Sequence, residues 1–181
     1  MGAKNVTIKA GGVLGAWIET PVKQRQKDVD ARWKKKNAEV HYGHKNHVKA
    51  DAKSKVLERC AVTAASVHDS QKLAEMVATQ HGAVYADSAY RCAEAEAMLP
   101  EKQVTNQIHE RAYRNRPFTA EQKESIQKKS KIRGWIKHVF GCMSQSMKGF
   151  YLRYIGRRRN TAAIGLINLI YNLDRYEKSC G

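Results

Sequence analysis

Residues 83–91 read AVYADSAYR, and the rest of the chain is arranged around them. Small and aromatic residues of strand type lead into Asp87, and an Ala/Glu-rich run of helical type follows. In open sheets flanked by helices, functional side chains gather at the carboxyl ends of strands, so Asp87 is a candidate functional residue. An aspartate ahead of a helix can also be no more than its N-cap, and the remaining sequence has to separate the two interpretations.

Strand and helix patterns alternate on both sides of this stretch. An antiparallel hairpin is expected over 39–50 and 56–63, because turn chemistry (DAKS, 51–54) separates two strand-like runs. The other predicted elements are a helix over 66–81, a helix over 91–99 stopped by Pro100, a strand over 103–108, a helix over 119–147 that starts with a Thr119/Gln122 capping box, and a helix over 161–176 that closes the core. This order predicts an α/β fold.

Composition points to a polyanionic partner. The 181 residues suffice for one domain, and 33 Lys and Arg against 17 Asp and Glu give a net charge of +16. A pI near 9.8 favours nucleic acid as the partner. The four cysteines form no CxxC pair, and neither a signal peptide nor a membrane span is evident, so we expect a cytoplasmic protein with reduced thiols and no membrane partner.

The positive charge is concentrated late in the chain. Residues 111–160 hold fourteen Lys or Arg and two acids. In the predicted helix 119–147 one face is apolar and expected to be buried: Ile132, Trp135, Ile136, Val139, Phe140 and Met143. The other face carries Lys128, Lys131, Arg133 and Lys137, and Arg153 and 157–159 continue the basic surface. A charge run is often only a solvated face, but the scarcity of acids here favours a phosphate track.

Three histidines, His41, His44 and His47, fall within the first predicted hairpin. Residues three apart on a strand point to opposite faces, so these side chains are not expected to converge on one metal ion. Surface or substrate-facing roles are the preferred interpretation.

Short strings that match one protein family run through the chain in order. They are RQKD (25–28), DARW (30–33), YG (42–43), KNHV (45–48), SVHDS (66–70), YADSAY (85–90), HVFG (138–141), Arg153 with IG (155–156), IGL (164–166), NL (168–169) and YN (171–172). Together they resemble the DDE transposases of bacterial insertion sequences over nearly the whole chain.

The resemblance implies a ribonuclease-H-like mixed sheet flanked by helices. In that family two Asp on the sheet and a Glu on a later helix hold two divalent ions, usually magnesium, which cleave DNA and transfer strands. The implied partners are double-stranded DNA, namely the element's inverted repeats and the target, and a homo-oligomer or full-length transposase. Cytoplasmic protein would associate with the nucleoid when bound to DNA. The residues expected to bind DNA are Arg114, Lys128, Lys131, Arg133, Arg153, Arg157 and Arg158.

The chain departs from the family at two of the three carboxylates. Asp87 matches the second Asp and is the expected metal ligand, but Lys137 occupies the Glu position just before HVFG. Residues 1–37 resemble the basic linker that follows the first Asp, so we expect 38–178 to be an N-terminally truncated catalytic domain. An ammonium group cannot ligate magnesium, so we expect the ion to be held poorly and the chain to be inactive alone.

Three functional hypotheses remain open at this point. The chain is a transposase polypeptide, here as a defective copy; or a remnant that binds element DNA or an intact transposase as a competitor; or a generic basic nucleic-acid-binding or ribosome-associated protein. Whether the chain, which has Asp87, cleaves DNA separates the first two hypotheses. Preference for inverted-repeat DNA over random duplex separates the last two.

Overall fold

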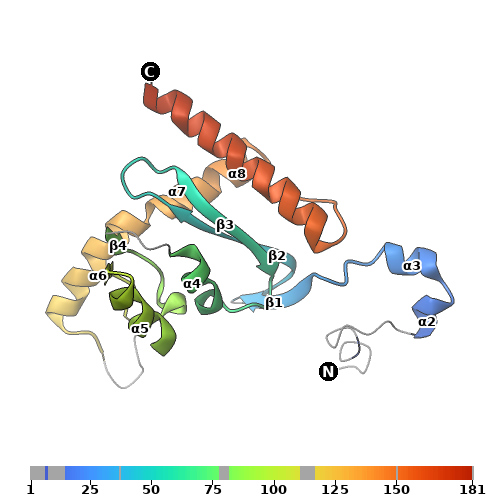
Figure 1. Ribbon diagram of the computed structural model, residues 1–181, viewed down its shortest axis with the longest axis horizontal. Helices are drawn as coiled ribbons and strands as arrows, with labels where there is room; N and C mark the ends of the chain where they lie inside the picture. Colours follow the sequence, from blue (N-terminus) through green and yellow to red (C-terminus); the bar gives the residue numbers. More distant parts are fainter. Residues whose placement is uncertain are drawn as a thin grey trace.

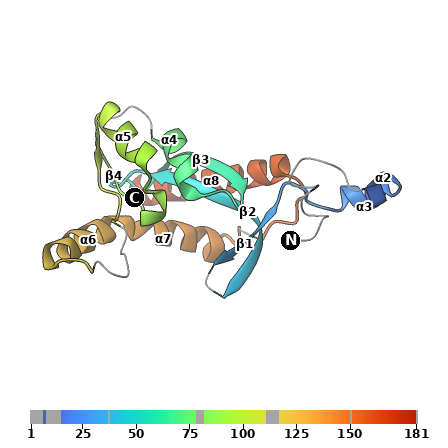
Figure 2. The same ribbon diagram turned by 90° about the horizontal axis from the view of Figure 1, so that it is seen from below.

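A computed structural model describes residues 7, 15–36, 38–77, 82–110, 117–149 and 151–180. Two short helices, α2 (Gly15–Ile18) and α3 (Pro21–Arg25), come first and extend away from the rest of the molecule (Figures 1 and 2). The part that positions the candidate site begins at residue 28. None of the described helices is both long enough and apolar enough to cross a bilayer.

The first sheet is antiparallel and confirms the predicted hairpin. Its order is β1 (Arg32–Lys36), β2 (Glu39–Ala50), β3 (Leu57–Ala64). The turn after β2 is built by Asp51, whose Oδ2 accepts the amides of Lys53 and Ser54 at 3.1 and 2.6 Å. β1 was not anticipated, because the sequence offered only a basic run there; it pairs with the first part of β2, from Glu39 to Gly43.

The second sheet is parallel and contains the Asp87 stretch. β4 (Gly82–Val84) pairs with β5 (Val104–Asn106), and α5 (Ala93–Glu101) connects them. The two sheets are separate, so among the described strands the single mixed sheet that the resemblance implied is not formed. The core of this half is one apolar cluster: Leu73, Val77, Ala95, Leu99, Val104 and Ile108.

Two helices of this half differ from the predicted ranges. Over 66–77 the structure has a 3₁₀ turn, η1 (Asp69–Lys72), and one turn of α4 (Leu73–Met76), while residues 78–81 lie outside the described part. α5 continues past Pro100 to Glu101. In the last turn a proline removes only its own N–H bond, so the helix ends beyond it rather than before it.

The predicted long basic helix is divided into consecutive segments. They are α6 (Ala120–Arg133), α7 (Trp135–Gly141) and a π-helical turn, η3 (Cys142–Ser146). The capping box predicted at Thr119 and Gln122 is present. Met143 and Val139 are buried against the first sheet, as expected. Ile132 is 38% exposed, as no residue of α6 is buried, and Trp135 at the start of α7 is 49% exposed.

The last helix, α8 (Arg157–Cys180), is longer than predicted and lies across the β2–β3 hairpin (Figure 1). Asn172 bonds the backbone of Leu57 in both directions, at 2.8 and 2.9 Å. The sequence predicts a helix that closes the core, but on its opposite face Leu169, Ile170 and Leu173 are 52 to 59% exposed. α8 is apolar on two faces, and the described part of the chain covers one of them.

A loop before β1 holds the beginning of α8. Asp30 Oδ2 accepts the amide of Arg157 at 2.9 Å, which satisfies one of the free N–H groups of the first turn. Asp28 Oδ2 lies 3.2 Å from His44 Nε2 and 3.5 Å from Asn160 Nδ2. These contacts join residues 28–30 to a helix more than 120 positions later in the chain.

Candidate active site and nucleic-acid interface

Asp87 follows β4 on an extended segment and caps the 3₁₀ turn η2 (Ser88–Tyr90). Its Oδ1 accepts the amide of Ser88 at 2.8 Å, so the capping role considered from the sequence is present. The second oxygen, Oδ2, points away from that turn toward Arg133, and the Asp87 side chain is 52% exposed. A carboxylate is therefore presented at the carboxyl end of a parallel strand.

Arg133 occupies the remaining oxygen of Asp87. Its Nη1 lies 3.0 Å from Asp87 Oδ2, and it is the last residue of α6. The two residues are 46 positions apart, and the sequence did not predict the contact. A guanidinium–carboxylate hydrogen bond is among the stronger polar contacts, so this pair fixes the end of α6 over the end of β4.

A buried histidine lies beside this ion pair. The His109 amide donates to the Ala86 carbonyl at 3.0 Å, and its Nε2 is 3.5 Å from Ser130 Oγ. Burial lowers the pKa of His109, and the positive charge of Arg133 lowers it further against the opposing effect of Asp87. The imidazole is therefore neutral at neutral pH. No motif in the sequence singles out His109, which follows a short strand.

A second polar cluster lies around Asp69. Lys45 Nζ is 2.9 Å and His47 Nδ1 is 3.9 Å from Asp69 Oδ1. Burial alone would raise the pKa of the Asp69 carboxyl, but the hydrogen bond and charge of Lys45 outweigh it and the pKa is lowered. The pKa of Tyr90 is raised to about 12 by burial and by the charges of Asp69 and Asp87. Asp69 belongs to the SVHDS string (66–70), which supports the family resemblance but does not indicate a function for Asp69.

Comparison with known proteins identifies the family. The transposase DDE domain family matches residues 19–173. The chain is 32% identical over 149 residues to the transposase for insertion sequence element IS1106 of Neisseria meningitidis serogroup B. The chain belongs to the DDE transposase family. The match covers 81% of the chain and 51% of that relative, so the chain spans about half of the relative's length. No solved structure matches the chain.

The surroundings of Asp87 in this transposase chain do not fit a magnesium ion. One oxygen of Asp87 accepts the Ser88 amide and the other the Arg133 guanidinium. Among the described residues, no three His, Cys, Asp or Glu side chains lie together as ligands. Magnesium requires several oxygen ligands, whereas this donor set holds one carboxylate already neutralised by an arginine. Lys137 lies exposed in the first turn of α7, four residues after Arg133.

The histidines of β2 contact three different partners. His41 lies 3.4 Å from Glu39, His44 pairs with Asp28, and His47 Nε2 is 2.9 Å from Thr63 Oγ1. Each of the three side chains therefore has a polar neighbour of its own.

The basic residues of the transposase chain fall on two separate parts of the molecule. Lys128 and Lys131 are exposed on α6, where Glu124 pairs with Lys128 at 2.8 Å. Arg153, Arg157 and Arg158 are exposed around the beginning of α8, and Figures 1 and 2 show α6 and that end of α8 well apart, with the β2–β3 hairpin between them. Arg114 lies outside the described residues. The basic residues predicted to form one phosphate track therefore lie in two separate patches. Arg133 is in neither patch, because it pairs with Asp87.

Proposed function

We propose that this transposase chain binds the DNA ends of an insertion sequence and does not cleave them by itself. One observation carries the proposal: the carboxylate that corresponds to a catalytic Asp of the family, Asp87, is bound by Arg133. Lys137 supports it further, because a cation stands where the family carries its Glu. The activity of a complete transposase is DNA transposition by cleavage and strand transfer, and of the three carboxylates that the family uses for it this chain matches one, Asp87.

The proposed fold over 38–178 is part of a ribonuclease-H-like catalytic domain, preceded by a basic linker-like segment over 1–37. The order of hairpin, helix, strand with Asp87, helix and strand supports this assignment. Magnesium is the ion that such a domain implies. With a single carboxylate neutralised by Arg133, we propose that Asp87 does not retain it.

The DNA-binding part of the proposal rests on charge and its placement. A net charge of +16 provides the sequence-independent attraction for phosphate. Lys128 and Lys131 on α6, and Arg153, Arg157 and Arg158 near α8, are exposed side chains that can reach a phosphate backbone. Because the two patches lie well apart, we propose that one duplex spans both of them or that two duplexes contact one patch each.

A nicking assay tests the catalytic half of the proposal. The purified chain is incubated with a supercoiled plasmid carrying the ends of the IS1106 element, with magnesium or manganese. We expect no nicking, and no difference between the wild-type chain and Asp87→Ala. Nicking by the wild-type chain that disappears in Asp87→Ala would contradict the proposal.

Binding specificity decides between the transposase-derived role and a generic basic protein. Fluorescence anisotropy compares the IS1106 ends with a shuffled duplex of equal length at ~0.15 M salt, where nonspecific attraction is weakened. Preference for the element ends supports a remnant that competes for transposase sites. Equal affinities would favour the generic nucleic-acid-binding hypothesis.

A further inference from the structure

A two-stranded ribbon, formed by β1 and residues 39–43 of β2, projects from the rest of the molecule (Figure 2). β3 pairs with β2 only from His44 onward, so the ribbon has no third strand among the described residues. Its sequence, RWKKKNAEVHY (32–42), holds four Lys or Arg and one acid. The ribbon is therefore a projecting and strongly cationic element.

The pairing register divides the ribbon into two faces. Residues directly opposite each other across an antiparallel pair share a face, and successive residues of a strand alternate between faces. Trp33 lies opposite Tyr42. Two positions further along β1, Lys35 lies opposite Val40 on the same face. These four residues form the aromatic face of the ribbon.

The aromatic face is turned to solvent. All four of its side chains are exposed, Trp33 by 63%, Val40 by 57% and Tyr42 by 49%. On the opposite face of the ribbon Arg32 and Lys34 are half-buried, so that face is turned toward the protein. Neighbouring apolar side chains left in water, unlike single scattered ones, indicate an interaction site.

The two rings of the aromatic face are held in place. Their centroids lie 4.8 Å apart at an interplanar angle of 46°, so the Trp33 ring packs against that of Tyr42. The Tyr42 hydroxyl donates to the carbonyl of Asp28, which fixes the far end of the tyrosine. Rings that are already ordered lose little conformational freedom when a ligand binds. The pair is therefore a preformed platform for a flat apolar group.

The ligand of such a platform has to combine a flat apolar surface with negative charge, because Lys35 lies on the same face and cations dominate the ribbon. Unpaired nucleotides have both properties. In a duplex each base is covered by its stacked neighbours, whereas a single strand leaves its bases open to an aromatic side chain.

We propose that the aromatic face binds single-stranded DNA, with a base stacked on Trp33 and a phosphate beside Lys35. DNA is the expected nucleic acid because the chain belongs to a transposase family. Stacking accepts any base, so this contact adds affinity without sequence preference. The inference goes beyond the proposed function, which concerns duplex ends.

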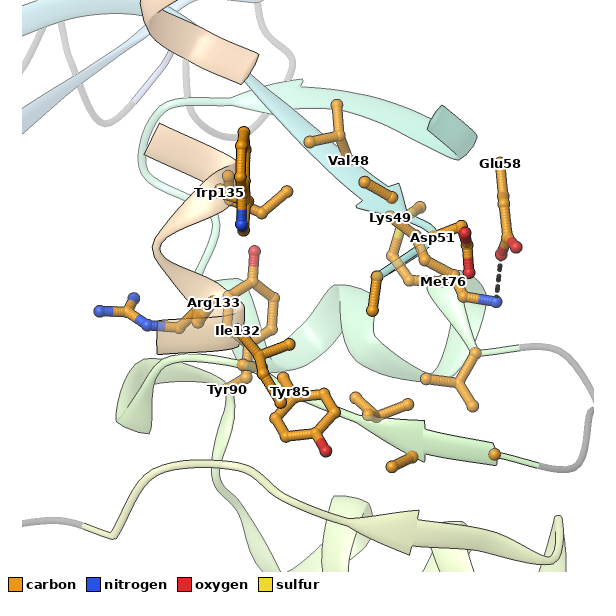
Figure 3. A pocket seen from close by; sticks show the side chains of 18 of the residues that line it. Val48, Lys49, Asp51, Glu58, Met76, Tyr85, Tyr90, Ile132, Arg133 and Trp135 are labelled. Carbon is orange, nitrogen blue, oxygen red and sulfur yellow. Dashed lines mark ion pairs between the residues drawn. The ribbon is translucent and has the colours of Figure 1, made fainter. Parts of the chain in front are cut away.

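Trp135 provides a matched control on another surface. It is 49% exposed and lines an apolar cleft of about 380 Å³, with Val48 on the β2 side and Tyr85 on the β4 side (Figure 3). Lys55 Nζ lies 4.9 Å from the centroid of its ring. Trp135 thus resembles Trp33 in exposure and in having a lysine nearby, but it lies away from the ribbon.

Fluorescence tests the contact while Trp33 is kept. The chain has three tryptophans, so Trp17→Phe with Trp135→Phe leaves Trp33 as the single indole. We expect oligo(dT) to bind this chain and to quench its indole emission, because a stacked base contacts the ring. Absence of binding, or binding without quenching, would overturn the proposal.

Anisotropy with labelled oligo(dT) measures the contribution of each side chain. Trp33→Ala should weaken binding about five- to a hundredfold, Trp33→Phe should retain most of the affinity, and Trp135→Ala should change nothing. Lys35→Ala should make the slope of log K against log salt less negative by about 0.7, the value for one phosphate of a single strand. Trp33→Ala should leave that slope unchanged. Equal affinities of Trp33→Ala and Trp135→Ala would overturn the proposal.

The duplex of IS1106 ends separates this proposal from the proposed function. We expect Trp33→Ala to bind the duplex as the wild-type chain does. An equal loss for duplex and oligo(dT) would overturn the single-strand proposal, as would a preference for oligo(rU) over oligo(dT). A wild-type chain that does not prefer the element ends, yet binds oligo(dT) through Trp33, would contradict the proposed function and support the single-strand contact.

Discussion

The carboxylate of Asp87 can pair with two kinds of cation. In this structure it pairs with the Arg133 guanidinium, and in the family the corresponding group is expected to hold a metal ion. The pair also affects DNA binding, because a guanidinium bonded to a carboxylate is less available to phosphate. Arg133 ends the helix that carries Lys128 and Lys131. The sequence placed Arg133 on the DNA-binding face, and the structure places its charge against Asp87.

We expect Asp87→Asn to strengthen binding to duplex DNA by releasing Arg133. One additional phosphate contact makes the slope of log K against log salt more negative by about 0.9. Anisotropy titrations between low and moderate salt measure this slope. The effect should vanish in the Arg133→Ala background, and Glu177→Gln, which removes one negative charge from an exposed residue of α8, is the matched control. An unchanged slope in Asp87→Asn would contradict the prediction.

His47 makes stability depend on pH. Its side chain is buried, burial lowers its pKa below 6.5, and Lys45 and Lys72 add to that effect against Asp69. Well above pH 6.5 the histidine is neutral in both folded and unfolded chains. Below it the unfolded chain takes up the proton first, so stability falls with pH until the folded pKa is reached.

Thermal melts at about pH 7.5 and 5.5 check this dependence. We expect the midpoint to be lower at the acidic pH, and the difference to shrink in His47→Gln, which retains a hydrogen-bonding group for Thr63. His41→Gln is the control, because that histidine is exposed. An equal pH effect in the wild-type chain and His47→Gln would show that another group is responsible.

Among the elements, α6 depends most on its own local interactions. It buries no side chain, so its capping box at Thr119 and Gln122 replaces the packing that stabilises most helices. We expect Thr119→Ala to destabilise α6 by about 1 kcal/mol and to speed hydrogen exchange in its first turn. Ser125→Ala, in the exposed middle of α6, should slow exchange slightly or leave it unchanged. Exchange equal to the wild type in Thr119→Ala would mean that tertiary contacts hold the helix.

The two faces of α8 predict opposite responses to truncation. Ile164 is 5% exposed, and Ile164→Ala should cost about 2–5 kcal/mol of unfolding free energy. Leu173 is 59% exposed, and Leu173→Ala should change stability by no more than about 0.5 kcal/mol. Denaturant unfolding measures both. A large loss in Leu173→Ala would show that this face is covered in solution, for example by a second copy.

Elements with local chemical signals were predictable from the sequence, and features that depend on distant contacts were not. The Asp51 turn and the Thr119 capping box use side chains a few residues from the backbone they bond, so the sequence contains both partners. The division of the basic helix at Gly134 has a weaker signal in the sequence, since one glycine inside a helical pattern is often tolerated. The Asp87–Arg133 pair and the exposed face of α8 depend on how elements meet, and periodicity does not encode that.

At the scale of the whole molecule, charge repulsion and uncovered apolar surface both reduce stability. The net charge of +16 repels itself, and the cleft and the outer face of α8 leave apolar area in water. We expect the isolated chain to melt at or below the lower end of the usual ~45–65 °C range. Added salt or duplex DNA should raise the midpoint, DNA by mass action. Circular dichroism with light scattering measures both, and a sharp melt above this range that is insensitive to salt would contradict the prediction.

The loop at residues 28–30 determines where the chain can be shortened. A protease that removes residues up to 27 leaves Asp30 on the first turn of α8 and Asp28 beside His44. A cut after Ala31 removes both carboxylates, so the amide of Arg157 and the buried imidazole of His44 lose their acceptors. The shortest fragment that keeps α8 seated on the hairpin therefore begins at or before residue 28, although β1 starts only at Arg32.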